Sequence, residues 1–219
     1  ILNAAQAAGV GHMVLLSAIC VQKPLLAFQQ AKLAFEEALA GSGLRYSIVR
    51  PTAYFKSLSG QLGRLRKGKP FLVFGDGEET ACKPISDGDL ARYLVECLED
   101  AARWDRVLPI GGPGPAVTPR EMGERLFALL GMTPRFRRVP VRLLDVIVGV
   151  LAAAGLREKA ELARIGRYYA TESMLVWNAA AGRYDADATP ETGEQTLFEF
   201  YAQLVAGRVA VDRGEHAVF

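Results

Sequence analysis

A serine and a lysine near the start of the chain have the spacing of a cofactor site. Ser17 ends the apolar run 13–16, and Lys32 follows fifteen residues later within a helix-like segment, 25–40. In open α/β sheets, ligands bind where the carboxyl ends of parallel strands open into a crevice. A lysine ammonium there holds ribose hydroxyls and favours negative charge nearby. The pattern is typical of one half of a nicotinamide-dependent reductase site, although an ordinary strand, loop and surface helix would also produce it.

The composition argues against several other kinds of site. The 219 residues contain 26 Lys and Arg against 24 Asp and Glu, a net charge of +2 that predicts no nucleic-acid footprint. The two histidines, His12 and His216, are far apart, so we expect neither a metal site nor a Ser-His-Asp triad. The three cysteines lack metal spacing, and we interpret them as reduced thiols of an intracellular protein.

The order of the predicted elements favours a doubly wound α/β fold. Strands are expected at 12–17, 46–49, 71–74 and 106–110, and helices at 25–40, 55–68 and 87–98. Strands that alternate with helices predict a parallel Rossmann-type sheet, and the helices and short strands that follow predict a small, mostly helical C-terminal region. We therefore divide the chain into an NAD(P)-binding part, 1–114, and a substrate-side helical cap and tail, 115–219.

The helix expected at 25–40 is amphipathic. Its predicted inner face consists of Leu26, Leu33, Ala34 and Ala38, which leaves Glu36 and Glu37 in solvent.

The chain begins inside a helical pattern, without Met or a helix start signal. No glycine-rich turn of the type that binds a pyrophosphate precedes a helix, since 111–114 (GGPG) follows a later strand and reads as a turn. We interpret the sequence as lacking the N-terminal strands of the sheet and expect this chain alone to bind NADPH weakly.

Several longer motifs extend from one end of the chain nearly to the other. They are VLLSAICVQKPLL (14–26), YSIVRPTAYFKSL (46–58), FGDG (74–77), ACKPIS (81–86), LPIGGPG (108–114), IGRYYA (165–170) and ESM (172–174). With these motifs the chain resembles the divinyl chlorophyllide 8-vinyl reductases, atypical members of the short-chain dehydrogenase/reductase superfamily.

The resemblance implies an activity and a cofactor. The family reduces the C8 vinyl group of divinyl chlorophyllide a to ethyl in chlorophyll and bacteriochlorophyll synthesis, with NADPH as the hydride donor. It implies that Lys32 contacts the cofactor ribose and Ser17 the region of the nicotinamide. Pro51, Thr52 and Phe55 follow the second strand and would line the nicotinamide pocket.

The implied substrate is a flat, apolar tetrapyrrole with one propionate, so we expect an apolar site with few polar anchors. Tyr54, Phe55 and Phe74 are the candidate walls, and Lys56 or Lys83 the candidate partner of the propionate. Ordinary core packing is the alternative interpretation of each aromatic residue.

One position departs from the wider superfamily, in which a Tyr four residues before the Lys donates the proton. Phe28 stands at that position here, so the mechanism of carbonyl reduction does not transfer. This fits an activated alkene as the substrate, with Tyr54, Cys82 and Lys83 as candidate proton donors. The alternatives are a non-catalytic NADP-sensing regulatory protein of NmrA-like type and, third, an epimerase or carbonyl reductase.

The segment 141–155 is an apolar helix in which Val141, Leu144, Ile147 and Leu151 share a face. One interpretation is packing on the domain. The other is peripheral contact with pigment membranes, since the implied substrate is lipophilic.

Overall fold

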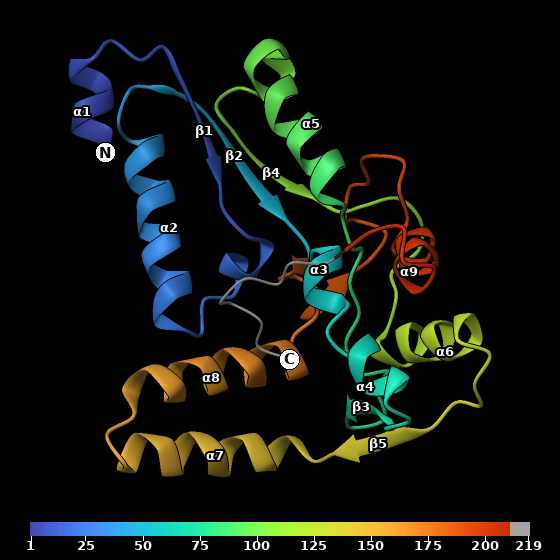
Figure 1. The fold of residues 1–219 in the computed structure, drawn as a ribbon. Helices are drawn as coiled ribbons and strands as arrows, with labels where there is room; N and C mark the ends of the chain where they lie inside the picture. The colour runs from blue at the N-terminus through green and yellow to red at the C-terminus, as the bar shows by residue number, and fades with distance from the viewer. Residues whose placement is uncertain (211–219) are drawn as a thin grey trace.

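The structure is a computed structural model that describes residues 1–210, and its centre is a three-stranded parallel sheet (Figure 1). The strand order is β1 (His12–Leu16), β2 (Arg45–Pro51) and β4 (Arg106–Ile110), with β2 in the middle. Leu15 lies opposite Ile48, and Ile48 lies opposite Val107. The parallel Rossmann-type sheet predicted from the sequence is confirmed. The predicted tail beyond residue 210, with His216, lies outside the described residues.

Helices cover both faces of this sheet. Helix α2 (Ala27–Ala40) connects β1 to β2, and α5 (Asp87–Glu99) packs on the opposite side (Figure 1). Side chains alternate between the two faces of a strand. Accordingly, Val49 packs in the core with Leu90 of α5, whereas Arg50 reaches Glu36 of α2. The sequence of β2 thus decides which side chains meet each helix.

The remaining strands differ from the prediction. The strand β3 (Phe71–Phe74) is outside the main sheet and pairs in parallel with β5 (Phe136–Val139). The β3–β5 pair therefore links the two parts into which we divide the chain, 1–114 and 115–219. That division stays a prediction. A short antiparallel hairpin, β6 (Val176–Asn178) and β7 (Arg183–Asp185), was not expected.

The helix predicted at 55–68 is wrong as a single element. It forms two short helices, α3 (Phe55–Leu58) and α4 (Leu62–Arg66). The Ser59 hydroxyl donates to the carbonyl of Phe55 at 2.7 Å, an interaction that competes with helix continuation.

The predicted inner face of α2 is also wrong in part. Ala34 and Ala38 are exposed, whereas Gln29, Glu36 and Leu39 are buried. The helix turns a polar residue inward because partners for its carboxylate stand at the ends of β1 and β2.

Helices dominate the rest of the chain. They are α1 (Leu2–Ala7) before β1, the 3₁₀ turns η1 (Ile19–Gln22) and η2 (Ala101–Arg103), α6 (Pro119–Leu129), α7 (Val141–Ala153), α8 (Arg157–Thr171) and α9 (Leu197–Val205). The main chain and side chains of Thr118 and Glu121 form a capping box at the start of α6. Within residues 1–210, no helix has both the length and the apolar character needed to cross a bilayer.

Two hydrophobic clusters hold these elements together. The larger one joins α3, α4, β3, α6 and α9 around Phe55, Leu65, Phe127 and Tyr201. The smaller one lies between the main sheet and α5 and contains Val49, Ile85, Leu90, Cys97 and Ile110. The carboxyl ends of β1 and β2 therefore emerge between two packed regions.

Candidate functional site

The carboxyl ends of β1 and β2 place two hydroxyl side chains in equivalent positions. Ser17 follows β1, and its N–H donates to the carbonyl of Val49 at 2.8 Å. Thr52 follows β2, and its N–H donates to the carbonyl of Ile110 at 3.0 Å. Both residues continue the ladder of the sheet by one position, and both are buried. The main chain of the sheet thus fixes the positions of both hydroxyls.

The Ser17 hydroxyl is engaged by a buried carboxylate. It donates to Glu36 Oε1, and the Arg50 guanidinium donates to both oxygens of the same carboxylate, with Nε at 3.1 and 3.2 Å. The Glu36 side chain is 3% exposed and that of Arg50 18%. This network joins α2 to the ends of β1 and β2, so it holds the loop after β1 in place.

A line of side chains one helical turn apart runs along α2. It consists of Phe28, Lys32 and Glu36, spaced four residues apart. Phe28 packs against the larger hydrophobic cluster, whereas Lys32 is exposed and has no side-chain hydrogen bond or ion pair within residues 1–210. Burial raises the pKa of the Cys20 thiol, while the Gln29 side chain and the Lys32 charge lower it, which places Lys32 beside the segment after Ser17.

Gln29 is the most unusual buried group of this region. Its Oε1 accepts from the N–H groups of Leu25 and Leu26 at 2.8 and 2.9 Å, which fixes the start of α2. Its Nε2 is buried without a hydrogen-bond partner in the described part of the chain. The Tyr168 hydroxyl nearby donates to the carbonyl of Cys20 at 3.3 Å. The residues after β1 are therefore held by α2 and α8 together.

The other predicted cofactor residues follow β2. Pro51 is its last residue and pairs with Ile110. The Thr52 hydroxyl donates to the carbonyl of Lys83, and the Phe55 ring is 2% exposed and packs on Phe200 at a centroid distance of 5.3 Å. Pro51 and Thr52 thus lie at the sheet edge beside Ser17, whereas Phe55 belongs to the core.

Tyr54 lies between these two groups. It forms an isolated bridge with Ile85. Burial, together with the charges of Asp87 and Cys20, raises the pKa of its hydroxyl to about 12. Tyr54 is half-buried and packs against the smaller hydrophobic cluster.

The predicted substrate lysines are both occupied by carboxylates. Lys56 Nζ lies 2.5 Å from Asp87, on the surface. Lys83 is buried, and its Nζ donates to Glu191 at 2.6 Å and to the carbonyl of Thr189 at 3.3 Å. A propionate would therefore compete with an existing partner at either lysine.

Two further predicted residues lie in β3 or after it. Phe74 is the last residue of β3 and is half-buried. Cys82 is buried, and burial raises the pKa of its thiol to about 12. The structure does not bring Phe74 to the sheet edge where Ser17 and Thr52 lie, because β3 pairs with β5.

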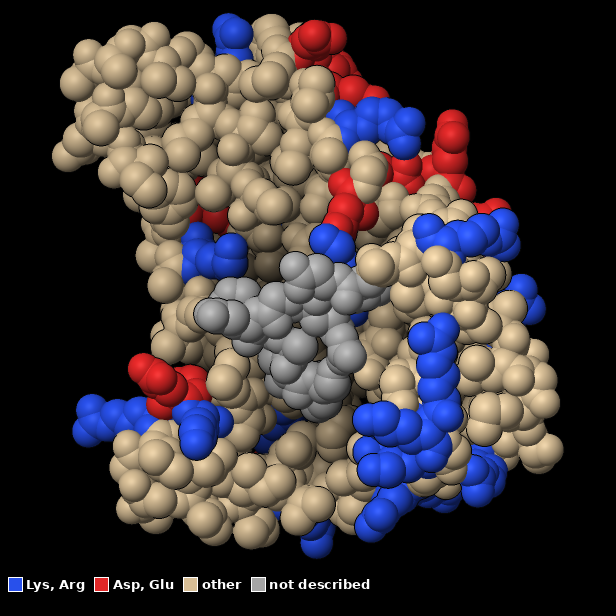
Figure 2. Space-filling model, viewed as in Figure 1, with Lys and Arg blue, Asp and Glu red and all other residues tan. Residues whose placement is uncertain are grey.

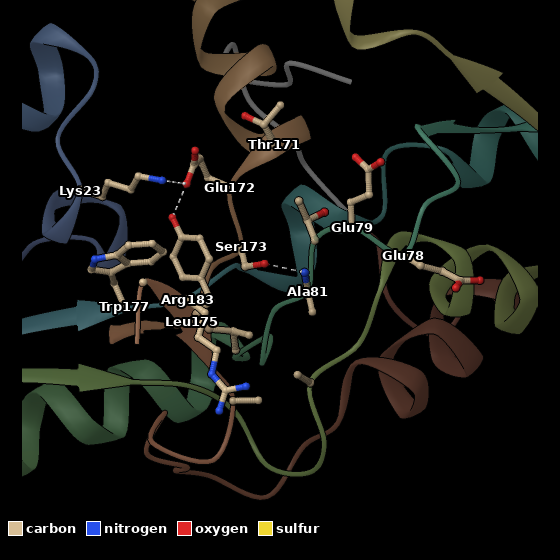
Figure 3. Close-up of a pocket in the computed structure, with 15 residues that line it drawn as sticks. Lys23, Glu78, Glu79, Ala81, Thr171, Glu172, Ser173, Leu175, Trp177 and Arg183 are labelled. Carbon is tan, nitrogen blue, oxygen red and sulfur yellow. Dashed lines mark hydrogen bonds and ion pairs between the residues drawn. The ribbon is translucent and has the colours of Figure 1, made fainter. Parts of the chain in front are cut away.

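A hollow of about 520 Å³ lies beside η1, and sequence reasoning missed it (Figure 3). Lys23, Glu172 and Trp177 are among its lining residues. Glu172 Oε2 accepts from Lys23 Nζ at 2.8 Å and from the Tyr184 hydroxyl at 2.5 Å. Lys23 Nζ also lies 4.7 Å from the centre of the Trp177 ring, a cation–π distance. Arg183, from the same hairpin, is exposed at this hollow.

The missed residues had a signal in the sequence. Lys23, Arg50 and Glu172 are charged residues inside motifs that carry the family resemblance, and Glu36 is one helical turn from Lys32. Their charge within otherwise apolar or tightly turned segments is the signal that could have indicated a specific partner for each.

Comparison with known proteins agrees with this architecture. Residues 1–101 match a family model described as NAD(P)H-binding. Among solved structures, an NADPH-dependent quinone oxidoreductase from Escherichia coli, complexed with NADPH, matches with a TM-score of 0.68 at 20% identity. The match covers 93% of this chain and 69% of that chain, and it shows the fold.

Two sequence relatives match this chain over nearly its whole length. The divinyl chlorophyllide a 8-vinyl-reductase of Zea mays is 48% identical over 229 residues, which cover 100% of this chain and 57% of that protein. The protein of the same name from Cucumis sativus is 50% identical over 222 residues, which cover 96% of this chain and 53% of that protein. The chain thus spans little more than half the length of these relatives, both described as chloroplastic. The chain is thus similar over nearly its whole length to divinyl chlorophyllide a 8-vinyl-reductases, and its first 101 residues match an NAD(P)H-binding family model.

Proposed function

We propose that this chain carries part of the active site of an NADPH-dependent reductase that converts the C8 vinyl group of divinyl chlorophyllide a to ethyl. The observation that carries the proposal is the identity of 48–50% with reductases of that name across nearly the whole chain. We keep the division into an NAD(P)-binding part, 1–114, and a substrate-side part, 115–219, as elements of the same proposal.

Lys32 is the residue that we assign to the cofactor ribose. Its ammonium is exposed, stands beside the loop after β1 and has no carboxylate partner within residues 1–210. A cation in this position fits a polyhydroxylated, negatively charged ligand. When bound, NADPH would supply the hydride. Ser17, Pro51 and Thr52 would border its nicotinamide from the carboxyl ends of β1 and β2.

Reduction of a vinyl group to ethyl adds one hydride and one proton across the carbon–carbon double bond. Phe28 has no proton to give. Tyr54 carries a proton at neutral pH, as an ordinary tyrosine does, and burial, with the charges of Asp87 and Cys20, raises its pKa further, to about 12. The residue is half-buried. We therefore retain Tyr54 as the candidate proton donor in preference to Cys82, which is buried.

The tetrapyrrole needs a flat apolar wall and a cation for its propionate. Phe55, Phe74, Lys56 and Lys83 remain the residues predicted from the sequence. The hollow beside η1 offers a second possibility, because the rings of Trp177 and Tyr184 meet at 4.9 Å there and Arg183 is exposed nearby.

The test is the reaction itself. Because weak binding of NADPH is expected, the assay uses purified protein with a saturating concentration of NADPH. Divinyl chlorophyllide a should then give the monovinyl product, measured by chromatography and by the shift of the Soret band. Lys32→Met should raise KM for NADPH by about 10- to 100-fold, the loss of one charged hydrogen bond. Lys159→Met, which changes an exposed lysine of α8, should leave KM unchanged. A Lys32→Met enzyme with normal KM would remove Lys32 from the cofactor site.

The second candidate is a non-catalytic NADP-sensing protein. The observation that favours it is that the Ser17 hydroxyl is engaged by Glu36 and that Phe28 replaces a proton donor. This candidate binds NADPH but gives no monovinyl product and no Soret shift with divinyl chlorophyllide a.

The location is part of the same proposal. We keep a cytoplasmic protein with peripheral contact to pigment membranes, and fractionation of cells followed by immunoblotting tests it.

A further inference from the structure

The outer side of α7 is apolar where a surface helix is normally polar. Four apolar residues of α7 are exposed: Leu143, Val146, Ile147 and Val150. Val146 is 61% exposed and Val150 is 63% exposed. They recur at i, i+3, i+4 and i+7, which puts them on one face of the helix. An amphipathic helix of a globular protein turns such a stripe toward the core.

The other side of α7 is already packed. Helices α7 and α8 form an antiparallel hairpin at one edge of the molecule (Figure 1). The half-buried residues of α7 are Val141, Leu144, Val148 and Leu151, so three of the four residues of the predicted apolar face lie on the packed side. The fourth, Ile147, lies on the open side. The helix therefore carries two apolar faces, and its hairpin partner accounts for one of them.

Charged residues lie within α7 and just beyond its two ends. Within α7, the sequence has two charged residues, Arg142 and Asp145, and Asp145 is paired with Arg167 of α8. Arg137 and Arg138 stand just before the helix, and Arg157 follows it.

The positive charges at the two ends are available to a partner. Arg137, Arg138, Arg142 and Arg157 form no side-chain hydrogen bond or ion pair in the part of the chain that the structure describes. Figure 2 shows apolar or uncharged atoms along this lower edge, with Lys and Arg gathered toward its two ends and acidic atoms also present at one of them.

We propose that α7 is a membrane-contact helix that lies flat on an anionic lipid surface. Leu143, Val146, Ile147 and Val150 enter the boundary between headgroups and acyl chains, and the arginines at the two ends bind lipid phosphates. Thirteen residues rise only about 20 Å, too short for the hydrocarbon core, so the helix lies in the plane of the interface.

The chemistry of the face favours lipid over a protein partner. Its four side chains are aliphatic, with no aromatic ring or hydrogen-bonding group, whereas the cores of protein interfaces are enriched in Tyr, Trp and other aromatic residues. Unpaired arginines around an aliphatic stripe match an acyl layer covered by phosphates. The alternative partners of this face are a second copy of the chain and another part of the same protein. The crosslinking experiment below distinguishes them from lipid.

The experiment is flotation of the purified protein with two kinds of vesicle. One kind is phosphatidylcholine alone, and the other contains about 30% phosphatidylglycerol, since basic segments respond to anionic lipid. We expect the protein to float with the anionic vesicles and to be released as salt is raised. The double variant Val146→Glu/Val150→Glu should lose at least about 10-fold in apparent affinity.

The matched control is Val95→Glu on α5. Val95 is 59% exposed and also lies on a helix, so the change adds the same charge at a similarly exposed site away from the hairpin. Circular dichroism confirms that each variant is folded. The proposal is overturned if the wild-type protein stays at the bottom of the gradient with both vesicles, or if Val95→Glu loses as much binding as the double variant.

A photo-crosslinker at position 146 identifies the partner that contacts the open face of α7. Crosslinks to lipid support the proposal, and crosslinks to a second copy or to another part of the same protein contradict it. Neither measurement needs NADPH or substrate, so failure here is independent of the reductase activity.

Discussion

Replacing Glu36 by Ala tests the network that fixes the loop after β1. The change removes a carboxylate that is 3% exposed and leaves the Arg50 guanidinium, 18% exposed, and the Ser17 hydroxyl without their partner. Removing one member of a buried ion pair costs about 3–5 kcal/mol. Because Arg50 retains some contact with solvent, we expect the lower end, about 3 kcal/mol.

The assay is urea and thermal unfolding of the two proteins side by side. For a chain of this length, a loss of about 3 kcal/mol lowers Tm by roughly 6–12 °C. The slope of the urea transition should not change, because the surface exposed on unfolding is the same. Added salt should leave most of the effect in place, since a buried pair is weakly screened.

Glu161→Ala is the matched control. Glu161 pairs with Arg164 on the surface of α8, where the two side chains are 49% and 40% exposed. An exposed pair is worth about 0–1 kcal/mol, and salt weakens it. If Glu36→Ala lowered Tm no more than Glu161→Ala, or if salt abolished its effect, the buried network would not hold the site as described.

Three further outcomes follow from the packing. Gly112→Ala should lower Tm by several degrees because a Cβ there would lie 1.9 Å from the carbonyl oxygen of Pro84, whereas Gly63→Ala, in α4 with open space, should be neutral or stabilising by about 0.4–1 kcal/mol. Burial opposes ionisation of Asp89, but hydrogen bonds from neighbouring side chains and main-chain N–H groups outweigh it and lower its pKa. Its contribution to stability is therefore complete above about pH 4 and is lost as the pH falls through the lowered pKa, so an acid titration of Tm should be shallower for Asp89→Asn. Tyr201→Phe should cost about 1–3 kcal/mol in urea unfolding, because it leaves a carbonyl of α3 without its 2.8 Å donor, and an unchanged transition would contradict that bond.

Elements that depend on neighbouring residues are those that local signals in a sequence can specify. The capping box of Thr118 and Glu121 and the N-cap of Ser86 each join residues three positions apart. The apolar runs of β1 and β4 indicated parallel strands, and these strands flank β2 in the main sheet. The burial expected for β1 is wrong, because its residues are half-buried or exposed.

Features that depend on distant partners were not predictable in this way. Helical periodicity placed Glu36 in solvent, but Ser17 and Arg50, from the ends of two different strands, draw it inward. The strand β3 has a sequence suited to the main sheet, and its partner β5 lies more than sixty residues later. The hollow beside η1 combines segments around residues 23, 79, 172 and 183, which no local pattern connects.

The most direct test of the central claim is turnover of divinyl chlorophyllide a by the purified protein with NADPH. The account predicts one monovinyl product and one NADP⁺ for each NADPH consumed, followed together by chromatography and by absorbance of the cofactor. Binding of NADPH with no monovinyl product under any condition would contradict the assignment as an 8-vinyl reductase and would favour the sensor.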